Sequence, residues 1–406
     1  MITDNQTNKI YFSPALERDC PRLWESIHKA LTERKIRHGI LMKEPMYFWC
    51  RDYMPIQIAE DNYVAYHFRP DYLLKEKDKY EYALKCDGYE ICKAMNYPMT
   101  EMDLVLDGGN VVKCGDTIVM TDKVFLENPD KSRIEVERIL HDKLQSDILF
   151  LPWDTEDYCG HSDGMVHYAG EGRILASSYY YDFYPGFAKE IEKILEKKFD
   201  VIRLKSDIKL KNRNNWAYIN FLQTEKLIMV PQLDIEEEDA LAIEQIRKVF
   251  PDVEVIGIPA LEAVNDDGAL NCVSWNIKDN GTLPHELAEI ISPIKQLIRE
   301  FPELMNGNIM KPIQQFAEDT TLFPSPVEIG KAKHAVDSIL RHAQSVQYPS
   351  FIPESSRRLG LSDGSVMEIT NDNANKWIDV AGILRVFLDR LQHLETNLRF
   401  EFVGSV

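Results

Sequence analysis

The sequence lacks an apolar run of roughly 18 residues, the length that a membrane-spanning helix needs. Its first nine residues, MITDNQTNK, are too polar for a signal peptide. Basic residues are scarce, with 47 Lys and Arg against 66 Asp and Glu, which gives a formal net charge of −19. This charge argues against nucleic acid or an anionic membrane surface as the main partner and suits cationic ligands, although solubility alone would also explain it. We therefore expect a cytoplasmic protein.

The sequence also lacks the paired cysteine spacings of a zinc site or a disulfide framework. Its seven cysteines are scattered at positions 20, 50, 86, 92, 114, 159 and 272. We therefore expect reduced thiols and no metal site. For a cysteine taken alone, a small buried hydrophobic side chain is the usual role. A chemical role for Cys272 thus depends on its sequence context.

What the chain does contain is enough apolar material for a large core. It has 406 residues, of which 44% are hydrophobic, so more than one domain is expected. Up to about residue 280, short β-type runs alternate with amphipathic helical stretches, the pattern of an α/β architecture. The predicted strands are 117–120, 148–151, 173–176, 227–231 and 253–258, and the predicted helices include 134–140 and 187–195. The strand–helix unit recurs without a strict repeat, so a pseudo-symmetric ring is one open arrangement.

The character of the sequence changes beyond residue 280. We divide the chain into an α/β domain of residues 1–280 and a mainly helical region of residues 281–406. Apolar residues in the second region form helical stripes over 287–298, 329–343 and 383–398. These stripes carry no clustered histidine, cysteine or paired acids, so we expect core packing or an oligomer contact, and a homo-oligomer through this region is a further expectation.

Prolines interrupt the helical region after its first stripe. Pro293 should kink the first helix or make it restart. Further prolines at 302, 312, 324 and 326 lie between the first two stripes and predict an irregular connection there.

Four short stretches of the first domain contain the residue types that chemistry on a guanidinium group requires. A guanidinium is planar and cationic, so it calls for carboxylates along its nitrogen edge. Its carbon is a poor electrophile, and a thiolate is the strongest nucleophile available near neutral pH. Loss of ammonia and attack by water call for a group that gives and takes a proton, as histidine does. The stretches are Trp49-Cys50-Arg51-Asp52, Asp107-Gly108-Gly109-Asn110, Gly160-His161-Ser162-Asp163-Gly164 and Asp267-Gly268-Ala269-Leu270-Asn271-Cys272.

His161 is the leading candidate for proton transfer, and His167 is a weaker one. Gly160 and Gly164 mark a tight turn that can expose the ring of His161. The carboxylate of Asp163 lies two residues on, and in an extended segment it should point the same way. A surface turn with solvated side chains is the alternative.

The other stretches have structural alternatives as well. Asp52 should lie at the end of an element, where an ion pair with its neighbour Arg51 is the alternative to a functional role. The glycine pair at 108–109 lets the backbone come close to another group, or else forms only a hairpin turn.

Cys272 follows acidic residues and a glycine, which is unlike a smooth buried strand. Nearby carboxylates raise the pKa of a thiol unless a cation lies alongside. We therefore expect the thiol to be activated only when a cationic substrate or a protonated His161 is next to it.

As an ordered set, these stretches resemble the agmatine deiminase and Porphyromonas-type peptidylarginine deiminase family of guanidine-modifying enzymes. The resemblance covers residues 10–278 and implies a five-bladed α/β propeller (pentein-like) with its site at the centre and no metal or organic cofactor. It is carried by Trp-x-Arg-Asp-x-x-Pro at 49–55, acid-Gly-Gly-Asn at 107–110, Gly-His-x-Asp-Gly at 160–164 and Gly-Ala-Leu-x-Cys at 268–272.

The resemblance also implies roles for individual residues. Cys272 would be the nucleophile and His161 the acid and base, while Asp52 and Asp163 would hold the guanidinium. A Tyr-x-Asn segment before a strand that ends in proline matches Tyr218-Ile219-Asn220 and Val230-Pro231. Asn220 is therefore a substrate-side candidate, with a simple turn asparagine as the alternative. The other substrate-binding candidates are Trp49, Arg51, Asp107 and Asn110.

The function predicted in this way is cofactor-independent hydrolysis of a guanidine to a ureido group plus ammonia, through a thiouronium intermediate on Cys272. The expected partner is a small cationic guanidine. Agmatine is the first expected substrate, as in putrescine biosynthesis, and arginine or peptidylarginine are the others. Amidino transfer from the same intermediate is one alternative. A catalytically silent propeller that serves in assembly or interaction is another.

Three departures from the family pattern bear on the substrate. Asp107 stands where the family commonly has Glu, and Asn271 stands where a His commonly precedes the cysteine. The amino-terminal Trp-Pro motif typical of true agmatine deiminases is replaced by Ile10-Tyr11-Phe12-Ser13-Pro14.

Overall fold

The chain divides into two compact units, Met1–Asn280 and Gly281–Val406. The structure is a computed structural model. It describes residues 1–41, 47–95, 97–157, 159–206, 213–279, 285–301, 310–319, 326–343, 358–360, 366–368 and 374–403.

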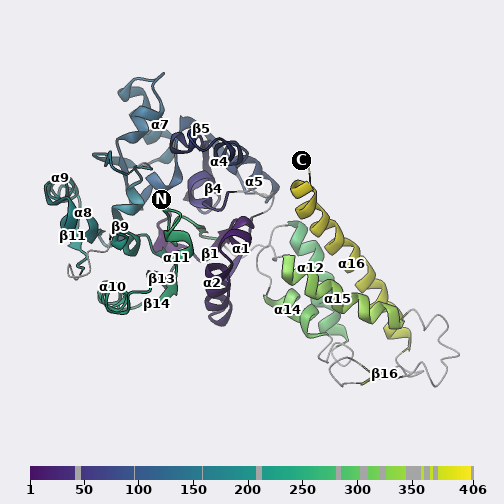
Figure 1. Ribbon diagram of the computed structural model, residues 1–406. Helices are drawn as coiled ribbons and strands as arrows, with labels where there is room; N and C mark the ends of the chain where they lie inside the picture. The colour runs from purple at the N-terminus through teal and green to yellow at the C-terminus, as the bar shows by residue number, and fades with distance from the viewer. Residues whose placement is uncertain are drawn as a thin grey trace. The chain divides into compact units, whose positions relative to one another are not determined.

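Five small three-stranded sheets make up the first unit, and all five share one pattern (Figure 1). In each sheet the first strand runs antiparallel to the middle strand, and the middle strand runs parallel to the third. The unit is therefore a five-bladed α/β propeller, as predicted. The blades are β15 (Ser274–Ile277), β1 (Lys9–Phe12) and β2 (Arg37–Ile40); β3 (Ile56–Ala59), β4 (Asn62–His67) and β5 (Met99–Val105); β6 (Val112–Cys114), β7 (Thr117–Thr121) and β8 (Asp147–Leu151); β9 (Val166–Gly170), β10 (Arg173–Ala176) and β11 (Asp200–Arg203); and β12 (Leu222–Gln223), β13 (Leu227–Gln232) and β14 (Glu254–Pro259).

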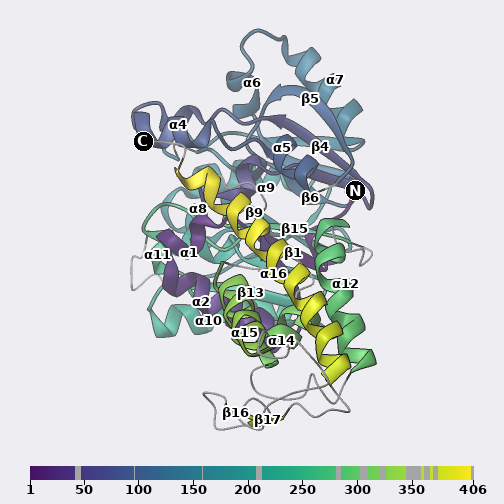
Figure 2. The same ribbon diagram turned by 90° about the vertical axis from the view of Figure 1, so that its right-hand side faces the viewer.

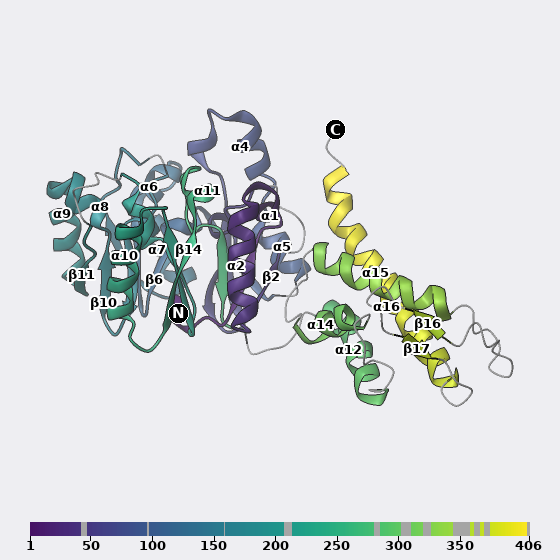
Figure 3. The ribbon, with the colours of Figure 1, turned by 60° about the horizontal axis from the view of Figure 1, so that its bottom comes forward.

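One main helix links the middle strand of each blade to its third strand, because two parallel strands need a crossover connection. Figure 3 shows three of these helices, α2, α9 and α10, beside their strands. The five are α2 (Pro21–Glu33), α5 (Gly88–Ala94), α7 (Arg133–Leu144), α9 (Pro185–Leu195) and α10 (Glu236–Val249). Shorter helical segments are η1 (Asp4–Gln6), α1 (Ala15–Asp19), η2 (Asp71–Leu73), α4 (Lys77–Ala83), α6 (Lys123–Glu127), α8 (Ser178–Phe183) and α11 (Leu261–Val264).

The sequence patterns account for these elements. The predicted helices 134–140 and 187–195 are α7 and α9, and the five predicted strands are β7, β8, β10, β13 and β14. Helix α7 is capped at its N-terminus by Ser132, whose side chain accepts a hydrogen bond from the Glu135 backbone N–H. All five residues of β7 are buried, which is why its apolar run is uninterrupted.

The ring is closed by its first and last strands. β1 pairs with β15 over the register from Lys9 opposite Ile277 to Phe12 opposite Ser274 (Figure 2). A buried ion pair between Lys9 and Asp279 lies beside this seam. Residues at the two ends of the unit therefore complete one blade together.

A short turn precedes the first strand of every blade. These turns are α3 (Cys50–Tyr53), η3 (Gly108–Asn110), η4 (Ser162–Gly164), η6 (Asn215–Ile219) and the turn at 269–273 before β15. The four sequence stretches and the Tyr218-Ile219-Asn220 segment thus occupy equivalent places in the five blades. The hairpin alternative for 107–110 is wrong, because β5 and β6 belong to different sheets.

The second unit is mainly helical, as its three apolar stripes predict. Helix α16 packs against α15 and α12, and α14 packs against both α12 and α15 (Figure 1). The described residues of the stripes are largely buried, and the ring centroids of Phe316 and Phe387 lie 5.6 Å apart. Helix α12 continues through Pro293, so the expected restart there does not occur. The elements are α12 (His285–Glu300), α14 (Lys311–Asp319), α15 (Pro326–Ala343), α16 (Ala374–Val403) and a two-stranded pair, β16 (Arg358–Gly360) and β17 (Val366–Glu368).

Part of the predicted irregular connection falls outside the described residues, including Pro302 and Pro324. Pro312 lies within α14, and Pro326 is the first residue of α15, a position that suits proline because its missing N–H has no helical acceptor. Among the described residues, every helix falls short of the combined length and apolar character that crossing a bilayer requires.

Candidate active site

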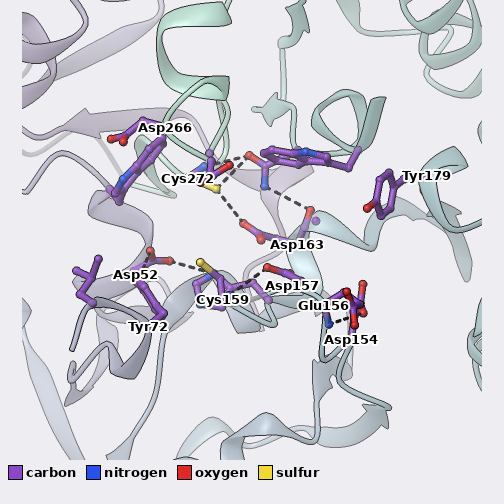
Figure 4. A pocket seen from close by; sticks show the side chains of 18 of the residues that line it. Asp52, Tyr72, Asp154, Glu156, Asp157, Cys159, Asp163, Tyr179, Asp266 and Cys272 are labelled. Carbon is purple, nitrogen blue, oxygen red and sulfur yellow. Dashed lines mark hydrogen bonds and ion pairs between the residues drawn. The ribbon is translucent and has the colours of Figure 1, made fainter. Parts of the chain in front are cut away.

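A cavity of about 360 Å³ lies in the first unit, where four of the five turn segments meet (Figure 4). Its lining is acidic and aromatic. The carboxylates come from Asp52, Glu76, Asp154, Glu156, Asp157, Asp163, Asp266 and Asp267. The aromatic side chains are Tyr47, Trp49, Tyr72, Tyr179, Tyr180 and Trp216. This lining suits a cation, because carboxylates attract it and aromatic faces contact it favourably.

His161 lies between two carboxylates from other blades. Its Nε2 lies 3.2 Å from Oδ2 of Asp107, and its Nδ1 lies 3.7 Å from Oδ1 of Asp52. Burial alone would lower the pKa of His161, but the negative charges of Asp52, Asp107 and Asp163 outweigh it and raise the pKa to about 10. His161 is therefore an imidazolium at neutral pH.

Asp52 is held by groups from two other segments. Its Oδ1 accepts a hydrogen bond from the backbone N–H of Gly109 at 3.1 Å, and its Oδ2 accepts one from the hydroxyl of Tyr72 at 3.4 Å. Burial raises the pKa of Asp52 to about 7, against the opposing effect of the positive His161. A cation bound beside this carboxyl would favour its ionised form.

The thiol of Cys272 contacts two polar side chains. Its Sγ lies 3.7 Å from Oδ2 of Asp163 and 3.3 Å from Oδ1 of Asn220 (Figure 4). The backbone N–H of Cys272 donates to the same Asn220 oxygen at 3.3 Å. Burial, and then the charges of Asp163 and Asp52, hold the pKa of the Cys272 thiol well above its usual range. A cation bound beside these carboxylates would lower it.

Exposure separates Cys272 from most of the other cysteines. Five of the seven are buried, and the two partly exposed ones, Cys159 and Cys272, both line the cavity. The five buried cysteines therefore fit the usual role of a small buried hydrophobic side chain.

The glycines of the stretches allow close contacts within the site. A Cβ added at Gly109 would lie 2.5 Å from Nδ1 of His161 and 2.8 Å from Oδ1 of Asp52. A Cβ at Gly268 would lie 2.2 Å from the ring of Trp49. The close approach predicted for the 108–109 pair is thus made by Gly109 to the imidazole and the carboxylate, and by Gly108 to the backbone carbonyl of Arg51.

The structure brings together most of the residues singled out in the sequence but moves three of them away from the cavity surface. Of these candidates, Trp49, Asp52, His161, Asp163, Asn220 and Cys272 line the cavity. Arg51, Asp107 and Asn110 are not among the described residues that line it, so their assignment to substrate contact stays a prediction.

Each of these three residues instead contacts neighbouring residues of the fold. Arg51 donates hydrogen bonds to side-chain oxygens of two asparagines, which also replaces the alternative of an ion pair with Asp52. Asp107 contacts His161. The side chain of Asn110 bonds to the backbone N–H and carbonyl of Thr121, so it joins the turn to β7. His167 bonds to Gln223 and also lies outside the described lining.

Sequence reasoning missed much of the cavity wall. The loop after β8 contributes Asp154, Glu156 and Asp157, and its run of acids was a usable signal. Tyr72 comes from the connection between β4 and β5, where no local pattern marks it. Asp266 lies on the other side of the view from Asp154 in Figure 4. The acidic lining therefore extends well beyond the groups around the thiol.

A bound metal ion needs several ligating side chains close together, which the described residues would have to supply. Within those residues, no three or more His, Cys, Asp and Glu side chains are grouped so as to hold one.

Solved structures share this fold over about two thirds of the chain. The agmatine deiminase of Enterococcus faecalis matches with a TM-score of 0.55 and 19% identity, covering 69% of this chain and 95% of that one. The agmatine deiminase of C. jejuni matches with a TM-score of 0.54 and 16% identity, covering 68% and 94%. The first unit is thus of the pentein class of propeller.

Sequence comparison assigns the chain to one family among the proteins that share this fold. The family model described as Porphyromonas-type peptidyl-arginine deiminase matches residues 24–277. The chain belongs to this family, as the four stretches indicated. A Lactococcus lactis protein named "Putative agmatine deiminase" is 26% identical over 208 residues, and one of that name from Shewanella baltica is 23% identical over 229. The matched parts span 42% and 46% of this chain and only 57% and 60% of those relatives.

Proposed function

We propose that this chain hydrolyses the terminal carbon–nitrogen bond of a guanidine, giving a ureido product and ammonia. The observation that carries the proposal is the convergence of a thiol, an imidazolium and two carboxylates from three of the turn segments on one acidic cavity. Membership of a deiminase family supports it. The similarity to solved deiminases, at 19% and 16% sequence identity, supports the fold alone.

In the first half of the proposed reaction, the guanidinium binds between Asp52 and Asp163. Its positive charge lowers the pKa of the Cys272 thiol, whose proton passes to Oδ2 of Asp163, 3.7 Å away. The sulfur then bonds to the guanidinium carbon. The departing nitrogen takes a proton from His161, the carbon–nitrogen bond breaks, and ammonia leaves with the Asp163 proton as ammonium. A thiouronium remains on Cys272.

In the second half, the now neutral His161 takes a proton from water, and the water oxygen bonds to the thiouronium carbon. The carbon–sulfur bond then breaks, the proton of the added hydroxyl passes to the sulfur, and the ureido product and the free thiol form. The high pKa of His161, about 10, suits both steps, since the ring begins protonated and is a strong base once it has given its proton away.

The substrate we propose first is a small guanidine with a second cationic group, of which agmatine is the simplest example. The carboxylates of Asp154, Glu156 and Asp266 also line the cavity, and they would attract an ammonium and repel a carboxylate. On this basis agmatine should be hydrolysed with a higher kcat/KM than free arginine or peptidylarginine.

Ammonia release from the purified protein tests the proposal. With millimolar agmatine, arginine and peptidylarginine supplied separately, agmatine should release the most ammonia, and Cys272→Ala should abolish the release. Cys20→Ala, which removes a buried thiol outside the cavity, is the matched control and should retain it. Activity that survives in C272A would contradict the assignment of the nucleophile.

Product analysis separates the alternatives. Mass spectrometry with an added amine acceptor should find the ureido product and no amidinated amine, whereas amidinated amine would indicate transfer. If Cys272 never reacts with iodoacetamide or chloroacetamidine near neutral pH, this result would favour the alternative of a catalytically silent propeller.

A further inference from the structure

Arg51 supports the turn that carries the nucleophile. Its buried guanidinium donates through Nη2 to Oδ1 of Asn271 at 2.8 Å and to Oδ1 of Asn276 at 2.7 Å. Its Nε donates to the carbonyl of Asn271 at 3.2 Å, and its backbone N–H donates to the carbonyl of Cys272 at 3.1 Å. Each acceptor is an uncharged oxygen, so the amide of Asn271 is polarised by a full positive charge.

Asn271 connects this cation to Asp163. Its Nδ2 donates to Oδ2 of Asp163 at 2.7 Å, and the side chain is buried. Because Arg51 occupies the amide oxygen, the amide can present only its N–H donors to Asp163. The same Oδ2 lies 3.7 Å from the Sγ of Cys272. One side chain therefore fixes how the carboxylate is turned and how far it lies from the thiol.

We propose that Asn271 is a positioning residue, oriented by Arg51, that holds the Asp163 carboxylate in place beside the Cys272 thiol for a cationic substrate. The inference rests on the proposed function, since it gives Asp163 a guanidinium to bind. Asn271 is also a position where this chain departs from the pattern it resembles, which commonly has His. An amide takes up no proton in the working pH range, whereas an imidazole does, so Asn271 supports Asp163 equally at every pH.

Two thiol reagents test this role in the full-length protein without requiring turnover. Chloroacetamidine is a cation with the shape of a guanidinium, and iodoacetamide is neutral. With each, the sulfur of Cys272 displaces the halide and forms a sulfur–carbon bond, and the rate constant is read from the labelled peptide by mass spectrometry. The ratio of the cationic to the neutral rate constant reports how well the carboxylates guide a cation to the thiol.

Asn271→Leu removes both side-chain hydrogen bonds at similar volume, so this ratio should fall about tenfold or more. The variant should also show a larger rise in KM than loss of kcat for agmatine. Asn271→His keeps an N–H donor and should recover most of the ratio. Asn128→Leu removes another buried asparagine, one that bonds to backbone groups of Val105 and Val124, and should leave the ratio unchanged.

Arg51 enters the same test through a double-mutant comparison. Arg51→Gln should lower the ratio in the wild-type background and change it little in N271L, because the arginine acts through the amide.

An unchanged ratio in folded N271L overturns the proposal. If N271L does not fold, Asn271→Ser, whose side chain ends short of both partners, replaces it with the same expected fall. The wild-type protein could hydrolyse no guanidine while N271L still lowers the ratio of the two rate constants. This pair of results would contradict the proposed function but support the positioning role of Asn271.

Discussion

At the residue scale, one imidazole and the carboxylates around it set the electrostatics of the cavity. With the pKa of Asp52 at about 7 and that of His161 at about 10, kcat/KM for a cationic guanidine should fall below pH 7 and above pH 10. On the acid side Asp52 becomes neutral and loses its attraction for the cation. On the basic side His161 loses the proton that the leaving ammonia needs.

Asp107→Asn tests this assignment. Removal of a negative charge 3.2 Å from Nε2 of His161 lowers the pKa of the imidazolium, and it also removes a charge that raises the pKa of Asp52. Both limbs of the pH profile of kcat/KM should therefore move to lower pH, each by an amount on the order of one pH unit. Limbs that stay in place or move apart would show that other groups govern the profile.

Gly109 lies against both the His161 ring and the Asp52 carboxylate and sets the spacing between them. Gly109→Ala would place a methyl group against the His161 ring and the Asp52 carboxylate and push them apart. Because a displacement near 1 Å can cost on the order of a hundredfold in rate, kcat/KM should fall by about that factor. Tm should fall as well, because overpacking a buried site costs about 1–3 kcal/mol. Gly186→Ala is the control, since a Cβ there meets nothing within 4 Å, and it should leave both quantities unchanged. Wild-type kinetics in G109A would contradict the tight contact.

At the element scale, the five turns explain the spacing of the sequence stretches. His161 and Asp107 are 54 residues apart, Asn220 and Asp163 are 57 apart, and Cys272 and Asn220 are 52 apart. Each interval is about the length of one blade, so residues far apart in sequence recur at the same place in successive blades. The sequence alone presents these stretches as an ordered set, and the sheets show that each one precedes the first strand of a blade.

Lys123 joins several elements around the site. Its buried ammonium lies 2.7 Å from Oε1 of Glu127, 2.8 Å from Oδ1 of Asp71 and 3.9 Å from Oδ2 of Asp107. Lys123→Met would leave Glu127 and Asp107 buried without this cation, at a cost of about 3–5 kcal/mol. Tm should then fall by about 6 °C or more.

The control for this prediction is Lys248→Met, which breaks an exposed pair with Glu244 four residues away. Such a pair contributes about 0.5 kcal/mol or less, so Tm should change by less than about 2 °C. Equal shifts in K123M and K248M, measured by differential scanning calorimetry, would contradict the structural role of Lys123.

Elements with a strong local signal were predictable, and those defined by distant partners were not. The apolar run of β7 and the apolar spacing of α7 depend on neighbouring residues, so the sequence indicated both elements. The role of Arg51 was missed because its acceptors, Asn271 and Asn276, lie 220 and 225 residues away. Tyr72 reaches Asp52 from a connection with no periodic pattern, and only folding brings them together.

At the scale of the whole molecule, the cavity belongs entirely to the first unit, since all of its described lining falls within Met1–Asn280. A chain ending at residue 280 retains the β1–β15 seam and should keep the kcat/KM of the full chain. If the second unit mediates self-association, the full chain should sediment as an oligomer and the shortened one as a monomer. A folded shortened protein without activity would show that the second unit contributes to catalysis.

The sequence by itself determined the α/β character of the first unit, the helical character of the second, the candidates for thiol and imidazole chemistry, and the acidic bias of the chain. Each of these depends on residue type and local spacing. The tertiary structure alone decided that Arg51, Asp107 and Asn110 stand behind the cavity, and that Asn271 links Arg51 to Asp163. The physical reason is that a propeller builds its site from one turn in each blade, so the neighbours of a functional group are set by ring closure rather than by sequence distance.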